Sequence, residues 1–193
     1  RIDKWENQSY RPEVWIEKDA LAGVFERVCN ELDVPMFSCR GYTSQSEMYV
    51  ASKRFENHSN DNQIPYILHF GDHDPSGMDM TRDIGDRLGI FGIDLEVNRL
   101  ALNFNQVEAY KPPPNPAKVT DSRAKVYIRK YGNESWELAA LEPDVLATLV
   151  REQIEGLRDD DEWQDSVDSE NEQKVILQKI SKRFDDVSTF LED

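Results

Sequence analysis

An apolar run that ends in two carboxylates constrains this chain more than any other feature. Residues 66–70 are mainly apolar, Pro65 precedes them and Gly71 follows, so the run predicts a buried β-strand that ends in a turn. Asp72 and Asp74 lie in that turn, and because side chains alternate in direction along an extended chain, both can point the same way. Residues at helical spacing come next: Met78, Thr81, Ile84 and Leu88. We therefore expect a strand, an acidic turn and a helix.

A second predicted strand also ends in a carboxylate. Residues 14–16 are apolar and lead to Glu17, and a helix with one apolar face follows directly. The carboxyl ends of parallel strands lie along one edge of a sheet, so Glu17 is expected to meet Asp72 and Asp74 there. An Asp-x-Asp pair alone more often caps a helix, but three convergent carboxylates need a counter-charge that Mg²⁺ supplies well. We predict that these three residues bind Mg²⁺, or Mn²⁺ in its place.

These residues also resemble a known family. The string Glu-Lys-Asp-Ala at 17–20 and the string Gly-Asp-His-Asp-Pro-Ser-Gly at 71–77 resemble the pattern of Toprim domains, which occur in topoisomerases, primases and nucleases. They are most similar to the Toprim domain of type IIB topoisomerase A subunits and of meiotic double-strand-break transesterases. The resemblance covers roughly residues 12–88. It implies a Toprim-like, Rossmann-like α/β fold: a mostly parallel four-stranded sheet, helices on both faces and a C-terminal helical extension.

The resemblance implies Mg²⁺-dependent cleavage or transesterification of nucleic acid, as in a topoisomerase or a nuclease. Asp72 and Asp74 would hold the metal ion, while Glu17 shares it or acts as general acid or base toward the leaving oxygen. In the topoisomerases the nucleophile is a tyrosine on a separate upstream domain, so the choice between topoisomerase and nuclease stays open. The alternative is a non-catalytic Toprim-like module that binds a protein partner through its C-terminal helices.

The pattern along the chain predicts one α/β core with extensions, because strands and helices alternate. The chain begins with Arg1, and we expect it to be a fragment of a longer protein. The expected segments are a lead-in from a missing upstream region at 1–11, the Toprim core at 12–110, and a basic segment with a C-terminal helical extension at 111–193. Other expected elements are a helix at 45–55, a surface loop at 56–63, a fourth strand at 95–102, irregular chain at 111–116 and a helix at 121–131.

The formal net charge of −15 argues against nucleic-acid binding by the general field of this chain. Acidic residues gather at 158–172, in a linker or helix start, and basic residues gather at 118–130, on a solvated helix face or a nucleic-acid flank. We expect DNA rather than RNA as the polymer, bound mainly through a missing domain. The residues expected to contact it are Arg40, Gly41, Lys118 and Arg123.

The turn at Arg40 and Gly41 has a second interpretation, an ordinary connection in which Ser44 caps the next helix. His69 and His73 are four residues apart, but zinc ligands at that spacing need a helix and this segment is predicted to be strand and turn. Glu137 lies in Trp-Glu-Leu-Ala-Ala-Leu, which resembles a Glu followed by Ala-Leu late in the same topoisomerase subunits; we treat it as structural, with contact to the metal ion as the alternative.

The chain shows no apolar run of the roughly 20 residues that a membrane span needs and no signal-peptide pattern, so we expect a cytoplasmic protein with no membrane contact. The last predicted helix packs on this domain, on a missing one, or on a second copy as a homodimer. Its apolar stripe consists of Ile176, Ile180, Phe184, Val187 and Leu191.

Overall fold

The chain divides into two compact units in the computed structural model. The larger unit is Ser9–Leu157, and the smaller one joins Arg1–Gln8 to the chain from Arg158 onward. The structure describes residues 2–95, 97–184 and 188.

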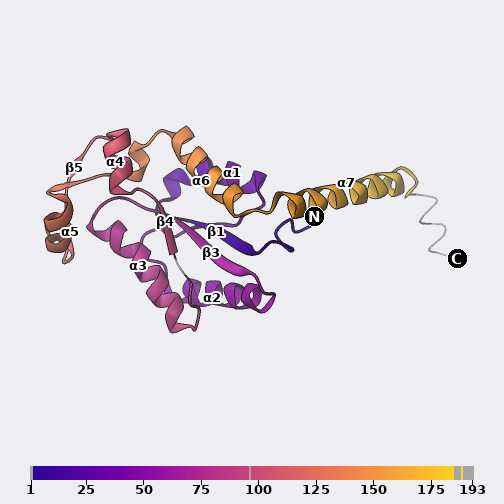
Figure 1. The fold of residues 1–193 in the computed structure, drawn as a ribbon, viewed down its shortest axis with the longest axis horizontal. Coiled ribbons are helices and arrows are strands. Elements are labelled where there is room, and N and C mark those ends of the chain that lie inside the picture. Colours follow the sequence, from indigo (N-terminus) through magenta and orange to yellow (C-terminus); the bar gives the residue numbers. More distant parts are fainter. Residues whose placement is uncertain (1, 96, 185–187, 189–193) are drawn as a thin grey trace. The chain divides into compact units, whose positions relative to one another are not determined.

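A four-stranded parallel sheet forms the centre of the larger unit (Figure 1). The strand order is β2-β1-β3-β4, so the first strand and the third lie side by side in the middle. The predicted α/β class with a parallel four-stranded sheet is therefore confirmed. The strands are β1 (Tyr10–Ile16), β2 (Met36–Ser38), β3 (Ile64–Phe70) and β4 (Val97–Ala101).

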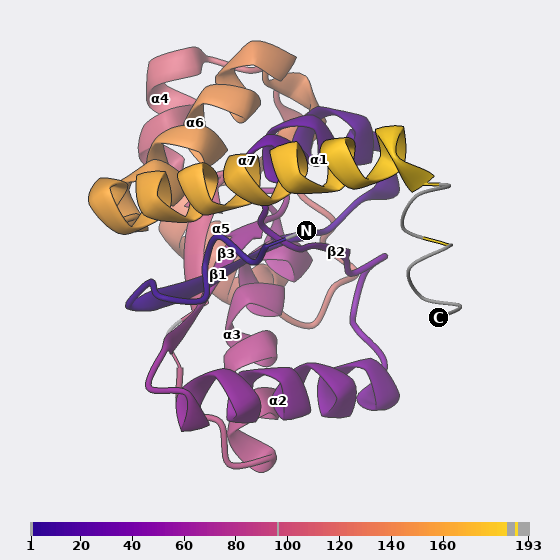
Figure 2. The same cartoon turned by 90° about the vertical axis from the view of Figure 1, so that its right-hand side faces the viewer.

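Helices cover both faces of this sheet because the chain changes direction after β2. Right-handed crossovers place the helix of the first connection on one face and the helices of the next two connections on the other. Figure 2 shows α2 and α3 below the strands, and α1 and α6 above them. These helices are α1 (Ala22–Glu31), α2 (Gln45–Asn60), α3 (Pro75–Ile90) and α6 (Pro143–Leu157).

Smaller elements gather at one end of the sheet, on the left of Figure 1. They lie near the carboxyl ends of the strands, because His73, just beyond β3, pairs with Trp136 through two backbone hydrogen bonds. The elements are α4 (Phe104–Tyr110), β5 (Asn115–Pro116), α5 (Ala124–Tyr131), β6 (Glu134–Ser135) and two 3₁₀ turns (Asp19–Leu21 and Leu138–Ala140).

The smaller unit is built around α7 (Asp160–Lys182). Asp159 caps this helix by accepting hydrogen bonds from two backbone amides of its first turn, and Trp5 packs edge-on against Trp163 with ring centroids 5.7 Å apart. Ile176, Ile180 and Phe184 of the predicted stripe are exposed, while Val187 and Leu191 lie outside the described residues. None of the described helices has the length and apolar character that a membrane crossing requires.

Several predicted boundaries differ from the structure. The loop expected at 56–63 is wrong, because α2 runs to Asn60; no glycine or proline interrupts it, and its asparagines are exposed. The chain at 111–116, expected to be irregular, contains the short strand β5, which pairs with β6. Helix α5 begins only at Ala124 because the turn before it, around Asp121, takes part in other hydrogen bonds.

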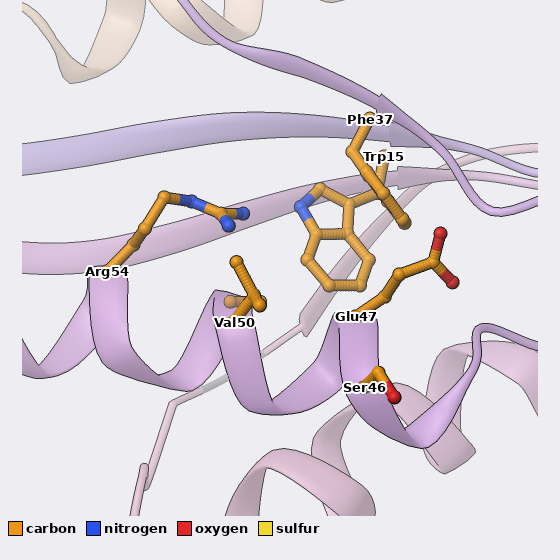
Figure 3. A pocket seen from close by; sticks show the side chains of 7 residues that line it. Trp15, Phe37, Ser46, Glu47, Val50 and Arg54 are labelled. Carbon is orange, nitrogen blue, oxygen red and sulfur yellow. The ribbon is translucent and has the colours of Figure 1, made fainter.

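The sheet face under α2 and α3 carries a hydrophobic cluster that includes Trp15 and Phe55, and beside it lies a hollow of about 190 Å³ (Figure 3). Trp15 and Phe37 reach into this hollow from the strands, and Val50 and Arg54 reach into it from α2. Arg54 donates two hydrogen bonds to Glu13, at 3.1 and 3.0 Å, and the Trp15 indole donates a third. Glu13 is only 2% exposed, so these donors stabilise a buried carboxylate.

Replacing Arg54 by Met should lower the free energy of unfolding by about 2 kcal/mol, because the buried carboxylate of Glu13 loses its cation. Lys53→Met is the matched control: Lys53 forms an exposed pair with Glu56 on the same helix and should show no measurable change. Chemical denaturation followed by circular dichroism measures both. Equal effects of the two substitutions would contradict a special contribution of the Glu13 pair.

Candidate functional site

Two of the predicted carboxylates meet where the strand order reverses. The connections leave β1 and β3 toward opposite sides of the sheet, and the crevice outside such a pair of carboxyl ends is the usual ligand site of an open α/β sheet. Glu17 follows β1 and Asp72 follows β3 by two residues. The backbone N–H of Asp72 donates a 2.8 Å hydrogen bond to Oε2 of Glu17. The expected meeting of these residues therefore occurs in the structure.

Two glycines make this close approach possible. A β-carbon at Gly71 would lie 2.9 Å from Oε2 of Glu17, and one at Gly77 would lie 2.3 Å from the backbone oxygen of Asp72. Real β-carbons do not come that close to other heavy atoms. A side chain at either position would therefore push the acidic turn away from Glu17 or from the first turn of α3.

Asp72 and Asp74 have different tasks in the structure. Asp72 is buried, and its Oδ1 accepts a 2.9 Å hydrogen bond from the backbone N–H of Leu138. Asp74 is the N-cap of α3, where Oδ1 accepts hydrogen bonds from the Gly77 N–H at 2.6 Å and the Ser76 hydroxyl at 2.9 Å. The helix-capping interpretation of the pair thus holds for one residue only. The other carboxylate faces a cation.

That cation is Lys18, which follows Glu17 directly. Its Nζ lies 2.6 Å from Oδ2 of Asp72 and 3.5 Å from Oε2 of Glu137. Among the described residues, no three His, Cys, Asp or Glu side chains lie together as ligands of one ion would, and the ammonium group lies between the carboxylates instead. Glu137, expected to be structural, therefore faces the same cation as Asp72, with its side chain 54% exposed.

Glu17 has an unusual acidity. Burial, reinforced by the negative charge of Asp72, raises the pKa of Glu17 to about 7, whereas the hydrogen bond from the Asp72 N–H acts in the opposite direction. Oε1 of Glu17 accepts no hydrogen bond from the described part of the chain. At neutral pH this group can therefore both give and take a proton.

His73, between the two aspartates, anchors the turn rather than binding a metal ion. Its Nδ1 lies 2.7 Å from the hydroxyl of Tyr127, and its ring contacts four aromatic rings. Burial lowers the pKa of His73 to about 4, so the ring is neutral at physiological pH. His69, the other member of the four-apart pair, lies instead against Thr81 of α3. The rings around His73 belong to Phe104, Tyr127, Tyr131 and Trp136.

The predicted nucleic-acid contacts are placed unevenly around this crevice. Gly41 has a φ of 89° and donates from its N–H to the backbone oxygen of Glu17 at 3.3 Å, so its turn adjoins the site. Arg40 is exposed and paired with Asp19 at 2.7 Å. Arg123 is already paired with Asp79 and Asp121. Lys118 is exposed, and nothing links it to the carboxylates.

The turn at Arg40 and Gly41 is also the ordinary connection between strand and helix that the sequence offered as its second interpretation. Ser44 caps α2 and forms a capping box with Glu47, as expected of an ordinary connection between strand and helix. The two interpretations are compatible, because Gly41 adjoins Glu17 while Ser44 begins the helix.

Arg99 of β4 is a site residue that the sequence pattern did not reveal. It lies opposite His69 in the sheet, and its guanidinium reaches the backbone oxygens of Gly71 and Asp72. The sequence does contain a signal for Arg99. This residue shares one face of its strand with Val97 and Ala101, and an arginine on such an apolar face needs buried hydrogen-bond acceptors.

Comparisons of this chain with protein-family models, with curated proteins and with solved structures found no match. The function of the chain therefore has to be inferred from the chemistry of these side chains.

Gly77→Ala should lower the free energy of unfolding by about 2 kcal/mol, because the new methyl group overlaps the Asp72 carbonyl and the packed turn must shift. Gly89→Ala, in the same helix, meets no atom within 4 Å and should raise stability by about 0.5 to 1 kcal/mol. Thermal and chemical unfolding measure both. A Gly77→Ala protein as stable as the Gly89→Ala protein would contradict the close approach.

The raised pKa of Glu17 predicts a specific pH dependence of stability. Between pH 4.5 and about 7 the folded protein keeps a proton that the unfolded chain releases, so stability falls as pH rises through this window. The slope reaches at most about 1.4 kcal/mol per pH unit. Glu17→Gln has no such proton and should gain stability relative to the wild type over this range, measured by denaturation with divalent ions chelated. Parallel pH curves would show that Glu17 titrates normally.

Proposed function

We propose that this chain is a Toprim-type catalytic domain for Mg²⁺-dependent cleavage of the phosphodiester backbone of nucleic acid. The observation that carries the proposal is the hydrogen bond from the Asp72 backbone N–H to the Glu17 carboxylate, which links the residues that follow two adjacent strands at the switch point of the sheet. The spacing of Glu17, Asp72 and Asp74 along the chain is that of the family it resembles. The raised pKa of Glu17 adds a group suited to proton transfer.

The residues present suit a hard divalent cation. Oδ2 of Asp74 and Oε1 of Glu17 accept no hydrogen bond from the described residues, and Oδ2 of Asp72 already faces a positive charge, that of Lys18. Carboxylate oxygens completed by water and phosphate are the ligands that Mg²⁺ and Mn²⁺ take in such sites. Asp72 and Asp74 would therefore hold the ion, with Glu17 next to Asp72, and Lys18 would give up its contact with Asp72.

Each residue then has a distinct task in the proposed reaction. A bound Mg²⁺ supplies charge neutralisation for the oxygens of the reacting phosphate. Asp72 and Asp74 hold the ion, and their backbone stays in place through Leu138 and the first turn of α3. Glu17, whose carboxylate accepts a hydrogen bond from the Asp72 N–H, gives or takes the proton of the attacking or leaving oxygen. Lys18, released from Asp72, would be free to pair with a phosphate oxygen.

Nucleic acid is expected to bind this chain weakly by itself. The net charge of −15 repels a polyanion, and both arginines among the expected contacts are paired with carboxylates. The proposal therefore assigns most of the DNA affinity to a further domain and only the chemistry to this crevice. Cleavage assays need low salt for the same reason.

A protein-binding module without catalysis is the second candidate. The observation that favours it is the row of exposed apolar side chains on the C-terminal half of α7. A protein partner that covered them would explain their exposure, and the acidic site would then have a structural role. The exposed residues are Val175, Ile176, Leu177, Ile180 and Phe184.

Metal binding is the first test. Mn²⁺ should bind the wild-type chain with a dissociation constant between sub-millimolar and millimolar, because the ion keeps several waters when phosphate is absent. Combining Asp72→Asn with Asp74→Asn should abolish this binding, measured by calorimetry or electron paramagnetic resonance. Asp160→Asn with Asp161→Asn is the matched control, since it makes the same charge change at the exposed start of α7. Unchanged binding in the Asp72 and Asp74 variant would move the site elsewhere.

The same preparations separate the roles of the carboxylates in cleavage. Glu17→Gln should retain most of the Mn²⁺ affinity but reduce Mg²⁺-dependent nicking of supercoiled plasmid by about 10² to 10⁴. A variant that loses metal as completely as the Asp72 and Asp74 variant would make Glu17 a ligand instead. A wild-type chain that binds Mn²⁺ but never nicks DNA contradicts a self-sufficient nuclease and leaves two possibilities, a topoisomerase domain whose nucleophile lies on another domain and the second candidate.

A further inference from the structure

The guanidinium of Arg99 is the most highly connected side chain beside the acidic turn. Its Nη2 donates to the backbone oxygens of Gly71 and Asp72, at 2.9 and 2.6 Å. Its Nη1 donates to the backbone oxygen of Gly77 and to Oγ1 of Thr81, both at 2.9 Å. One residue of β4 therefore bonds to the end of β3, to the turn and to the first turns of α3.

These contacts are ones that the backbone does not provide by itself. Among the described residues, no backbone N–H donates to the oxygen of Asp72 or of Leu102, and Arg99 supplies both donors, the latter from Nε at 3.3 Å. All five N–H groups of the guanidinium thus find acceptors. A lysine has only three donors on one atom and cannot reach this set of oxygens.

The positive charge of Arg99 also favours its place beside the acidic turn. Burial lowers the pKa of Arg99 to about 10, so the group remains a cation at neutral pH, and the negative charges of Glu17, Asp72 and Asp74 favour that cation. Nη1 of Arg99 and Oε2 of Glu17 lie 3.3 and 2.9 Å from the point where a Gly71 β-carbon would be. Arg99 therefore lies next to Gly71, on which Glu17 also converges.

We propose that Arg99 is the positioning residue of this site, which fixes the backbone on which Asp72 and Asp74 lie without itself contacting metal or substrate. Its role as part of a metal site rests on the proposed function, whereas its hold on the turn does not. Without the hydrogen bonds of the Arg99 guanidinium, the backbone oxygens of Gly71 and Asp72 lose the donors that it supplies. The hydrogen bond from the Asp72 N–H to Glu17 and the capping bond of Asp74 should then weaken.

The test compares Arg99→Lys with Arg87→Lys in the full chain. Arg87 is a fair control, because it lies on α3, is partly buried and donates to the backbone oxygen of Thr43 and to Gln45, away from the turn. Thr81→Val is a milder second variant that removes one acceptor of Nη1. Melting temperatures show whether each variant is folded.

Amide hydrogen exchange, followed by NMR with divalent ions chelated, is the first measurement. In Arg99→Lys the amides of Asp72, Gly77 and Leu138 should exchange about tenfold faster than in the wild type, while the Val14 amide, bonded to Pro35, should not change. Thr81→Val should show a smaller change at Gly77. Equal protection of the three amides in Arg99→Lys and Arg87→Lys overturns the inference, as does a uniform loss that includes Val14.

Mn²⁺ affinity is the second measurement. Residues that orient metal ligands typically change affinity 10- to 100-fold when replaced, so Arg99→Lys should weaken binding at least tenfold while Arg87→Lys leaves it unchanged. If the wild type, Arg99→Lys and Arg87→Lys bind Mn²⁺ with equal affinity, Arg99 does not position the metal ligands. A wild-type chain that binds no Mn²⁺ contradicts the proposed function instead, and the exchange of the three amides then decides the inference about Arg99.

Discussion

The site depends on one constraint, the placing of like charges side by side at the end of a parallel sheet. Glu17 and Asp72 follow adjacent strands, and no chain of this topology can separate them while both strands keep their register. The structure offsets their repulsion in three ways: a backbone amide for Glu17, an ammonium group for Asp72, and a proton that Glu17 retains up to about pH 7. Stability and acidity in this region are therefore two results of one arrangement.

The same constraint explains the glycines and the buried polar groups around the turn. Because Glu17, His69 and Arg99 all reach the space beside Gly71, no side chain fits there. Because α3 begins directly over the Asp72 carbonyl, Gly77 cannot carry one either. The aromatic rings around His73 then exclude water from the back of the turn, which strengthens the hydrogen bonds that hold it. The sequence between residues 69 and 77 is thus determined mostly by close packing.

Local patterns were enough to predict the parallel sheet, its alternation with the main helices, and the meeting of Glu17 with Asp72, since each depends on periodicity or on the common edge of parallel strands. They were not enough for contacts made by distant segments. Glu137 and Leu138 reach the turn from about 65 residues away along the chain, and no local pattern predicts that they meet Lys18 and Asp72. Helix α2 continues past its predicted end at residue 55 to Asn60, because asparagines at exposed positions do not end a helix. The position of Arg99 on a short apolar strand indicates buried acceptors, but these acceptors are backbone oxygens, so no pattern of side chains predicts which segments it joins.

Two cations serve the carboxylates, and they differ in what their removal would disturb. Arg99 is bound through all five of its N–H groups to backbone and threonine oxygens, so it cannot leave without releasing the turn itself. Lys18 contacts only carboxylate oxygens, its side chain is 36% exposed, and its flexible stem can swing toward solvent. A divalent ion that displaced the ammonium group would therefore find the backbone of Asp72 and Asp74 already in place, because the cation that fixes the geometry is not the one that gives way.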